Sequence, residues 1–406
     1  MKKNRSIRNG WLMRDGLRLI AIIVPMVTMI ACGGGDKPAA DTKAPGAPLR
    51  EAVKESDSPA ARPVANADTA KPQNSNQTKL SGVAQSQFPE IKYTRMALTK
   101  TLLDSVRRRF GKTKESSDGF RAITTLNRKE FGYFRVGDTI VVPDSIVGDL
   151  RAYSVFPAHY PAADSIRKLV LISNKYQCYA CYEHGSLVRF AACNSGTERK
   201  ATFPGRYALN WKERLRISSL NENWKLPFTF NFHLYAGNAF HQFTMPGRPV
   251  SHSCVRQFMP DAEWLFSWGE GGLRDTAGHM IPLSGTPVII IDVFDFSRPR
   301  GGPWLELASN RENVLKLPDS PMGVEEAWIP ISQVPTDARG GIPNRARYLA
   351  AEDTLRARGV IRPGVSLSAS INYNALRKAK EKRAAVGKPK PKAKEAAPET
   401  PKVDAG

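Results

Sequence analysis

Apolar residues follow a helical period from about residue 98 and the period of β-strands from about residue 166 onward. Between residues 98 and 110 they recur every four positions, which predicts a helix, and a second helix is predicted over residues 120–127. Residues 136–143 read as a turn that leads into a strand. Together these elements predict a small α/β subdomain over residues 89–148.

From residue 166 onward the pattern is mainly that of β structure. Strands are predicted over residues 169–172, 177–182 and 186–192, with a hairpin turn at Glu183-His184-Gly185, and further strands over 202–207 and 286–291. One helix is predicted over residues 261–268. This order predicts a mainly β domain, a sandwich or barrel, over residues 166–295. An extension over residues 296–375 has a helical run at 344–358 and no function that the sequence assigns.

Composition sets the two ends apart from this middle part. Residues 32–88 contain no aromatic residue before Phe88 and are rich in Ala, Pro, Asp, Lys, Asn and Ser, so we expect a disordered tether. Residues 376–406 are a basic Lys/Ala/Pro tail that is also expected to be disordered. The chain has a net charge of +22, and half of it lies in residues 1–31 and 377–406. We interpret these charges as solvated tails, because no nucleic-acid-binding motif accompanies them.

The first 31 residues have the pattern of an export signal. Basic residues precede an apolar run over 19–30 that is too short to span a bilayer stably. The run ends directly before Cys32, which three glycines follow, and this resembles a bacterial lipobox. The resemblance implies a lipid on Cys32 and a location in the cell envelope, anchored to a membrane and facing the periplasm. The alternative is an ordinary signal peptide with a chance cysteine.

A cysteine and two histidines gather in one short segment between the predicted strands. His241 precedes a Pro246-Gly247 turn, and Ser251-His252-Ser253-Cys254-Val255-Arg256 follows it. A cysteine becomes a nucleophile when a nearby base removes its proton, and histidine is the usual base. The alternative interpretation is a buried, inert cysteine with incidental histidines.

This segment resembles the active-site signature of the L,D-transpeptidase catalytic domain (YkuD type), over about residues 166–294. The resemblance implies that Cys254 attacks the stem peptide of peptidoglycan, forms an acyl-enzyme and passes the acyl group to a second stem as a 3→3 crosslink. It implies that His241 is the base and that the Gln242 carbonyl orients it. The amides around Ser253 and Cys254 would form the oxyanion hole.

The remaining residues of the signature receive supporting roles. The resemblance places Arg256 and Ser251 in loop positioning or substrate binding, and His252 as a polar contact to the site. It implies no cofactor and no metal, and a monomer whose partners are peptidoglycan stem peptides and, through its anchor, the membrane. The resemblance also implies a role in peptidoglycan biosynthesis, cell wall organisation and cell shape.

Ser253 stands where the family has glycine, and this leaves other functions open. Glycine in such a motif often serves a backbone with positive φ, where a side chain costs about 1 kcal/mol or more. A peptidoglycan-binding lipoprotein with a decayed site is therefore one alternative. Independently of Ser253, the sequence does not determine the acceptor: water would make the enzyme an L,D-carboxypeptidase, and a protein lysine is a further alternative. His233 is the reserve base if His241 does not serve.

Two further features carry weaker predictions. Residues 126–128 followed by 136–143 resemble the second half of a LysM-type peptidoglycan-binding module, and a plain helical subdomain is the alternative. A symmetric hairpin around His184-Gly185 would put Cys178 diagonally beside Cys193 on one face, so a disulfide between them is a candidate. Cys178 and Cys181 lack the paired spacing of a structural zinc site.

Overall fold

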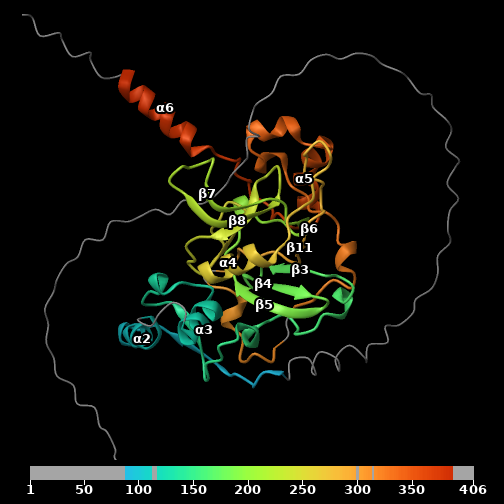
Figure 1. Cartoon of the computed structure of the whole chain (residues 1–406). Coiled ribbons are helices and arrows are strands. Elements are labelled where there is room, and N and C mark those ends of the chain that lie inside the picture. Colours follow the sequence, from blue (N-terminus) through green and yellow to red (C-terminus); the bar gives the residue numbers. More distant parts are fainter. Residues whose placement is uncertain (1–86, 112–116, 299–300, 313–314, 387–406) are drawn as a thin grey trace, which may run out of the picture. The chain divides into compact units, whose positions relative to one another are not determined.

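Two β-sheets face each other across an apolar core in the middle of the chain. The computed structural model describes residues 87–111, 117–298, 301–312 and 315–386 (Figure 1). The five-stranded sheet has the order β5-β4-β3-β11-β6 and the four-stranded sheet the order β10-β9-β8-β7. The strands of these two sheets are β3 (Leu169–Ser173), β4 (Cys178–Glu183), β5 (Ser186–Ala192), β6 (Gly205–Ala208), β7 (Lys212–Ile217), β8 (Lys225–His233), β9 (Asn238–Gln242), β10 (Val255–Gln257) and β11 (Pro287–Ile290). The expected β sandwich is confirmed, although the strands β7 to β10 are not among those predicted.

The five-stranded sheet is buried on both faces. In β3, Val170 and Ile172 join the core between the two sheets, where Phe230 of β8 also lies. Leu169 and Leu171 join a second core on the opposite face. Because successive strand residues point to opposite faces, an unbroken apolar strand such as β3 requires cover on both sides.

Part of that outer cover comes from the N-terminal subdomain. Strands β1 (Tyr93–Ala97) and β2 (Thr139–Pro143) pair antiparallel, and helices α2 (Lys100–Val106) and α3 (Asp118–Asn127) lie between them in the chain. Leu126 and Val141 belong to the outer core of the five-stranded sheet, so the subdomain expected over residues 89–148 shares its core with the sandwich. The LysM-type resemblance stays a prediction.

The hairpin of β4 and β5 differs from the symmetric register that was expected. Glu183 pairs with Ser186, but the register shifts between Tyr182 and Cys181, and Cys178 comes to lie opposite Ala192. A shift of one residue exchanges the faces of all positions beyond it. Cys178 therefore lies in the outer core and Cys193 in the core between the sheets, and both are free thiols. The candidate disulfide between them is wrong.

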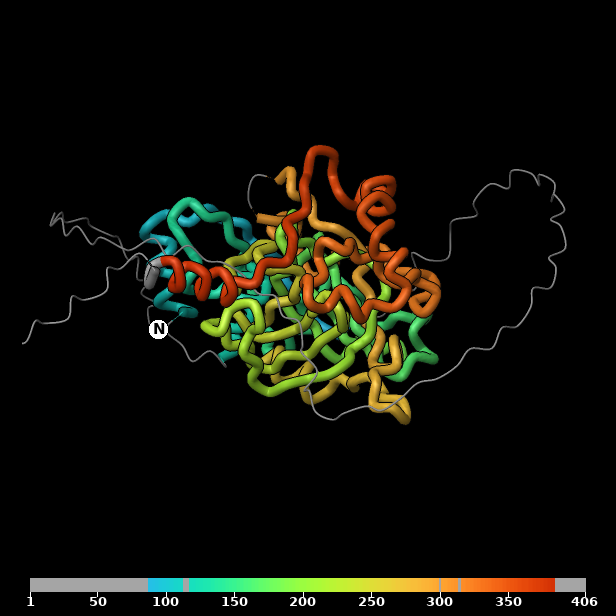
Figure 2. Tube along the Cα trace, turned by 90° about the horizontal axis from the view of Figure 1, so that it is seen from above, coloured from blue at the N-terminus to red at the C-terminus, as the bar shows by residue number. Residues whose placement is uncertain are grey.

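The C-terminal extension packs on the sandwich. Trp304 enters the outer core, whereas Ile329, Val334 and Leu355 enter the core between the sheets. Backbone contacts join Arg206 to Glu326 and Ser368 to Arg199, and the orange segment lies against the green and yellow strands (Figure 2). The extension is therefore part of the folded body and covers the two sheets.

The remaining helices are mostly short. Helix α4 (Met259–Trp268) and helix α5 (Arg345–Ala357) fall where helices were predicted, and helix α6 covers Tyr373–Val386. The start of the tail expected to be disordered from residue 376 is thus helical, because it is rich in Ala, Lys, Arg and Glu, which favour helices. Across the described ranges, no helix combines the length and the apolar character needed to cross a membrane. The predictions for the export signal, for Cys32 and for the rest of the tether and tail concern residues outside the described ranges, apart from the last two tether positions.

Candidate active site

A parallel strand pair brings the two halves of the cysteine–histidine segment together. Strand β9 carries His241, and β10 begins directly after Cys254. In their register Arg256 lies opposite His241, and Val255 lies opposite Phe240. Parallel neighbours need a crossover connection, and residues 243–254 supply it. The loop that contains the motif is therefore also the link that sets the two strands side by side.

His241 is held as a neutral ring with one nitrogen unoccupied. Its Nδ1 lies 3.0 Å from the Gln242 carbonyl oxygen, the contact that the family resemblance implies. Because a carbonyl can only accept, Nδ1 carries the proton and Nε2 keeps its lone pair. His241 is fully buried, and Nε2 has no hydrogen-bond partner among the described residues. Burial lowers the pKa of His241 to about 4, and the nearby Arg256 charge adds to the effect.

Cys254 is a protonated thiol under an apolar cover. Its side chain is 2% exposed and packs with Trp224, Leu226 and Ala239, with Tyr373 against the same cluster. Burial raises the pKa of Cys254 to about 11, although the Ala239 backbone amide and the charge of Arg256 oppose the rise. The thiol therefore needs a base before it can act as a nucleophile at neutral pH.

The imidazole of His241 emerges on the side of β9 that faces this thiol. Ala239, His241 and Phe243 alternate along the chain, which directs their side chains to one face. Ala239 and Phe243 both pack in the cluster that holds Cys254, and the rings of His241 and Phe243 are 6.0 Å apart. The unoccupied nitrogen of His241 thus lies on the face of β9 whose neighbouring residues contact the thiol.

Hydrogen bonds fix the backbone of the motif around Ser253. Ser253 has φ +75°, the left-handed conformation in which glycine is favoured, and its Oγ lies 3.2 Å from the Asn238 Oδ1. Thr202 Oγ1 donates to the Ser253 carbonyl at 3.0 Å. Ser251 donates its amide to Ser195 O at 3.0 Å and its hydroxyl to the Cys254 carbonyl. These hydrogen bonds hold the backbone of the motif in place. The role of the amides around Ser253 and Cys254 as an oxyanion hole stays a prediction.

Arg256 braces the crossover loop from inside. The guanidinium donates from Nη1 to the Thr244 carbonyl at 3.1 Å and lies 4.7 Å from the centre of the Phe243 ring. Arg256 is 2% exposed and Ser251 is fully buried. These contacts favour loop positioning for both residues, whereas a contact of either one with substrate stays a prediction.

Two aromatic residues that the sequence analysis did not single out cover the site. Trp224 lies in the loop between β7 and β8, and Tyr373 begins α6. Both rings pack beside His252, whose pKa burial lowers to about 4. Trp224 could have been suspected as a lone indole in a polar loop. Tyr373 lies more than a hundred residues beyond the motif, and nothing local marks it.

His233, the reserve base, is occupied elsewhere. The Ala236 amide donates to its Nδ1 at 3.1 Å, and its Nε2 lies 3.4 Å from the Tyr348 hydroxyl. Burial lowers its pKa to about 4 as well. With both ring nitrogens engaged, His233 has the contacts of a residue that ties the extension to β8.

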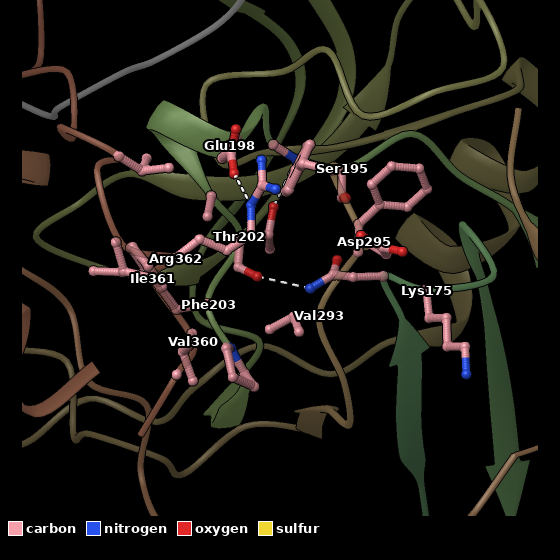
Figure 3. A pocket seen from close by; sticks show the side chains of 18 residues that line it. Lys175, Ser195, Glu198, Thr202, Phe203, Val293, Asp295, Val360, Ile361 and Arg362 are labelled. Carbon is pink, nitrogen blue, oxygen red and sulfur yellow. Dashed lines mark hydrogen bonds and ion pairs between the residues drawn. The ribbon is translucent and has the colours of Figure 1, made fainter. Parts of the chain in front are cut away.

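A cavity of about 420 Å³ lies between the extension and the strands but does not contain the thiol. Phe203, Val293 and Ile361 line its apolar part, and Arg362 pairs with Glu198 at its rim (Figure 3). Neither Cys254 nor His241 belongs to its lining. Among the residues that the structure describes, no group of three His, Cys, Asp or Glu could hold a metal ion.

Comparisons with known proteins identify the family of the domain that contains this site. Residues 167–290 match the family model of the L,D-transpeptidase catalytic domain. This match confirms the resemblance for that part of the chain. No curated protein matches the sequence.

Similar solved structures include three L,D-transpeptidases. That from Stackebrandtia nassauensis is 21% identical over 31% of this chain and 56% of its own, with a TM-score of 0.26. That from Mycobacterium smegmatis is 13% identical over 31% and 59%, with a TM-score of 0.26. That from Xylanimonas cellulosilytica is 23% identical over 43% and 78%, with a TM-score of 0.28. The chain thus spans little more than half the length of the first two, and at these TM-scores the family model alone carries the assignment.

Proposed function

We propose that the L,D-transpeptidase domain of this chain is an active cysteine enzyme that forms 3→3 crosslinks between peptidoglycan stem peptides. The observation that carries the proposal is the state of His241. A buried histidine whose Nδ1 is fixed by a carbonyl and whose Nε2 is unpartnered is prepared to accept one proton. It lies on the face of β9 that packs around a buried free cysteine.

The reaction proceeds in two steps, acylation of Cys254 and transfer of the acyl group to the acceptor amine. His241 Nε2 takes the proton of the Cys254 thiol, and the sulfur attacks the carbonyl of the third stem residue. The C–N bond to the terminal D-Ala breaks, its amine takes the proton from His241, and a thioester remains on Cys254. The side-chain amine of a second stem then attacks the thioester, gives a proton to His241, and releases the sulfur, which recovers its proton.

The motif backbone supports the charged intermediate of both steps. An oxyanion at the attacked carbonyl would accept hydrogen bonds from amides around Ser253 and Cys254. Such a donor typically contributes about 10²–10³ in rate, provided that it is held in place before the reaction. Hydrogen bonds from Thr202 and Ser251 to carbonyls of this segment hold it.

Mass spectrometry after exposure to a carbapenem tests the acyl-enzyme directly. The strained lactam carbonyl of a carbapenem is a surrogate for the stem carbonyl, so we expect one covalent adduct on Cys254. The buried thiols Cys178, Cys181 and Cys193 are an internal control that should stay unmodified, and Cys254→Ala should give no adduct. A folded wild-type protein without an adduct would favour the peptidoglycan-binding lipoprotein with a decayed site.

Product analysis separates the acceptors. Incubation with a purified disaccharide-tetrapeptide should yield crosslinked dimers and free D-Ala. Equal amounts of tripeptide and D-Ala without dimers would show an L,D-carboxypeptidase, since water would have replaced the amine.

We also propose that the chain is a lipoprotein anchored at Cys32. The support is the apolar run that ends directly before Cys32, and the long polar segment that follows it would separate the anchor from the enzyme. Several acyl chains on one cysteine hold a protein stably, so the wild type should stay in the membrane fraction at high salt. Cys32→Ser should release an active periplasmic protein. Salt-extractable wild type, or a mature N-terminus elsewhere, would contradict the anchor alone.

A further inference from the structure

A cleft of about 620 Å³ lies between the N-terminal subdomain and the crossover loop of the active site. One wall is residues 246–249, which belong to the loop that joins His241 to Cys254. The opposite wall comes from β1, the end of α3 and the turn before β2, with Arg95, Lys129 and Arg135. A ligand in this cleft would therefore touch the same loop that carries the catalytic motif.

The wall beside the active site is held rigidly against the subdomain. Glu130 donates its amide to the Met245 carbonyl at 2.9 Å, and Gly247 donates its amide to Asn194 Oδ1 at 3.0 Å. Gly247 has φ +83°, and a Cβ there would lie 3.0 Å from the Lys129 Cβ. The glycine thus permits a close approach to Lys129 that a side chain would prevent.

The cleft has a surplus of positive charge. Its lining holds five basic side chains and two carboxylates. Both carboxylates are already paired, Asp138 with Lys129 at 2.7 Å and Glu306 with Arg298. Arg95, Arg135 and Arg248 are exposed and have no ion-pair partner among the described residues. These three arginines all line the cleft, and of them Arg135 also donates from Nη1 to the Phe134 carbonyl at 3.0 Å.

We infer that this cleft binds the second, acceptor stem peptide through its free carboxylates; the inference rests on the proposed transpeptidase function. The guanidinium fork matches a carboxylate with two parallel hydrogen bonds, which a flexible ammonium group does not. A peptide with several carboxylates can engage several arginines at once. Its position beside residues 246–249 puts the bound peptide next to the loop from which the thioester is presented.

Binding of a soluble disaccharide-tetrapeptide to the full mature chain tests the inference. Cys254→Ala serves as the background, so that no turnover occurs, and affinity is measured by calorimetry for the natural probe and for one whose carboxylates are amidated. Arg135→Glu and Arg248→Glu should each weaken binding of the natural probe by about tenfold or more, the loss expected for a charge-assisted hydrogen bond. Arg274→Glu, an exposed arginine outside the cleft, should leave the affinity unchanged.

Three results would overturn the inference. The first is equal affinity for the natural and the amidated probe. The second is that the two cleft variants bind the stem peptide as tightly as the background protein does. The third is that these variants no longer bind anionic phospholipid vesicles but still bind the stem peptide. Carbapenem acylation of Cys254 in the Arg135→Glu and Arg248→Glu enzymes should match the wild type, because the cleft concerns the acceptor. Since binding needs no turnover, a failure here is distinguishable from a failure of the acylation test.

Discussion

Tyr373 lies flat against His252, with ring centroids 6.1 Å apart and ring planes 17° from parallel. Trp224 meets the Tyr373 ring at 5.5 Å and completes the cover over Cys254. Asn374 ties this contact down, because its Nδ2 donates to the Ser219 carbonyl at 3.0 Å and its Oδ1 accepts from the Glu222 amide at 2.9 Å. The start of α6 is therefore a fixed part of the surroundings of the nucleophile.

Removal of the Tyr373 ring should expose the thiol. Tyr373→Ala is expected to raise the rate of Cys254 alkylation by iodoacetamide by about two- to tenfold, since an aromatic pair contributes about 0.5–1.5 kcal/mol. Trp328→Ala, an aromatic residue elsewhere in the same extension, is the matched control. Equal alkylation rates in wild type and Tyr373→Ala would show that the thiol is reached by another route.

The assignment of the base makes a second prediction. His241→Ala should lower the rate of carbapenem acylation by about 10²–10⁴, the usual contribution of a positioned acid or base. His233→Ala should leave that rate nearly unchanged, because its nitrogens are engaged by Ala236 and Tyr348. The measurement is stopped-flow acylation of proteins with matched melting temperatures. The reverse order of effects would make His233 the base.

The buried pair also predicts the pH profile of acylation. The base is His241 in its neutral form, and its pKa of about 4 lies below the ordinary value of 6.5. The thiol stays protonated up to a pKa of about 11. The rate constant should therefore be flat from about pH 5 to 9 and fall only as His241 gains a proton at lower pH. A step centred near pH 6.5 would show a solvated histidine in this role.

The same shift makes stability depend on pH. The unfolded chain binds a proton at His241 before the folded chain does, so the free energy of unfolding should decrease as the pH falls from about 6.5 to about 4. The full effect of His241 is on the order of 3 kcal/mol. Urea unfolding at several pH values should show a weaker decrease in His241→Gln than in the wild type.

Ser253 allows a test of backbone strain against side-chain bonding. Ser253→Gly should gain about 1 kcal/mol by relief of the left-handed conformation and lose about as much with the hydrogen bond to Asn238. Its stability should thus stay near that of the wild type. Ser253→Ala keeps the strain and loses the bond, so it should be less stable by about 1 kcal/mol. Urea unfolding that ranks Ala above Gly would contradict this account.

The chemistry of the site could be predicted from the sequence because its parts are close along the chain. His241, the Pro246-Gly247 turn and Cys254 lie within one short segment, and its resemblance to the L,D-transpeptidase signature implies a nucleophile with a base. The strands of the five-stranded sheet were also predictable, since continuous apolar runs such as residues 169–172 leave few other structures open. Strand β7 was not, because most of its residues are exposed and polar at a sheet edge.

Features that depend on one inserted residue or on distant contacts were decided only by the tertiary structure. The register shift between Cys181 and Tyr182 puts Cys178 and Cys193 on opposite faces of the sheet, and no local pattern marks it. The cover of Cys254 by Tyr373 and the basic cleft beside residues 246–249 join segments more than a hundred residues apart. The sequence determined the reactive groups, because covalent order places them together. Only packing, which sums many weak contacts over the whole chain, decided what covers these groups and what charge lies beside them.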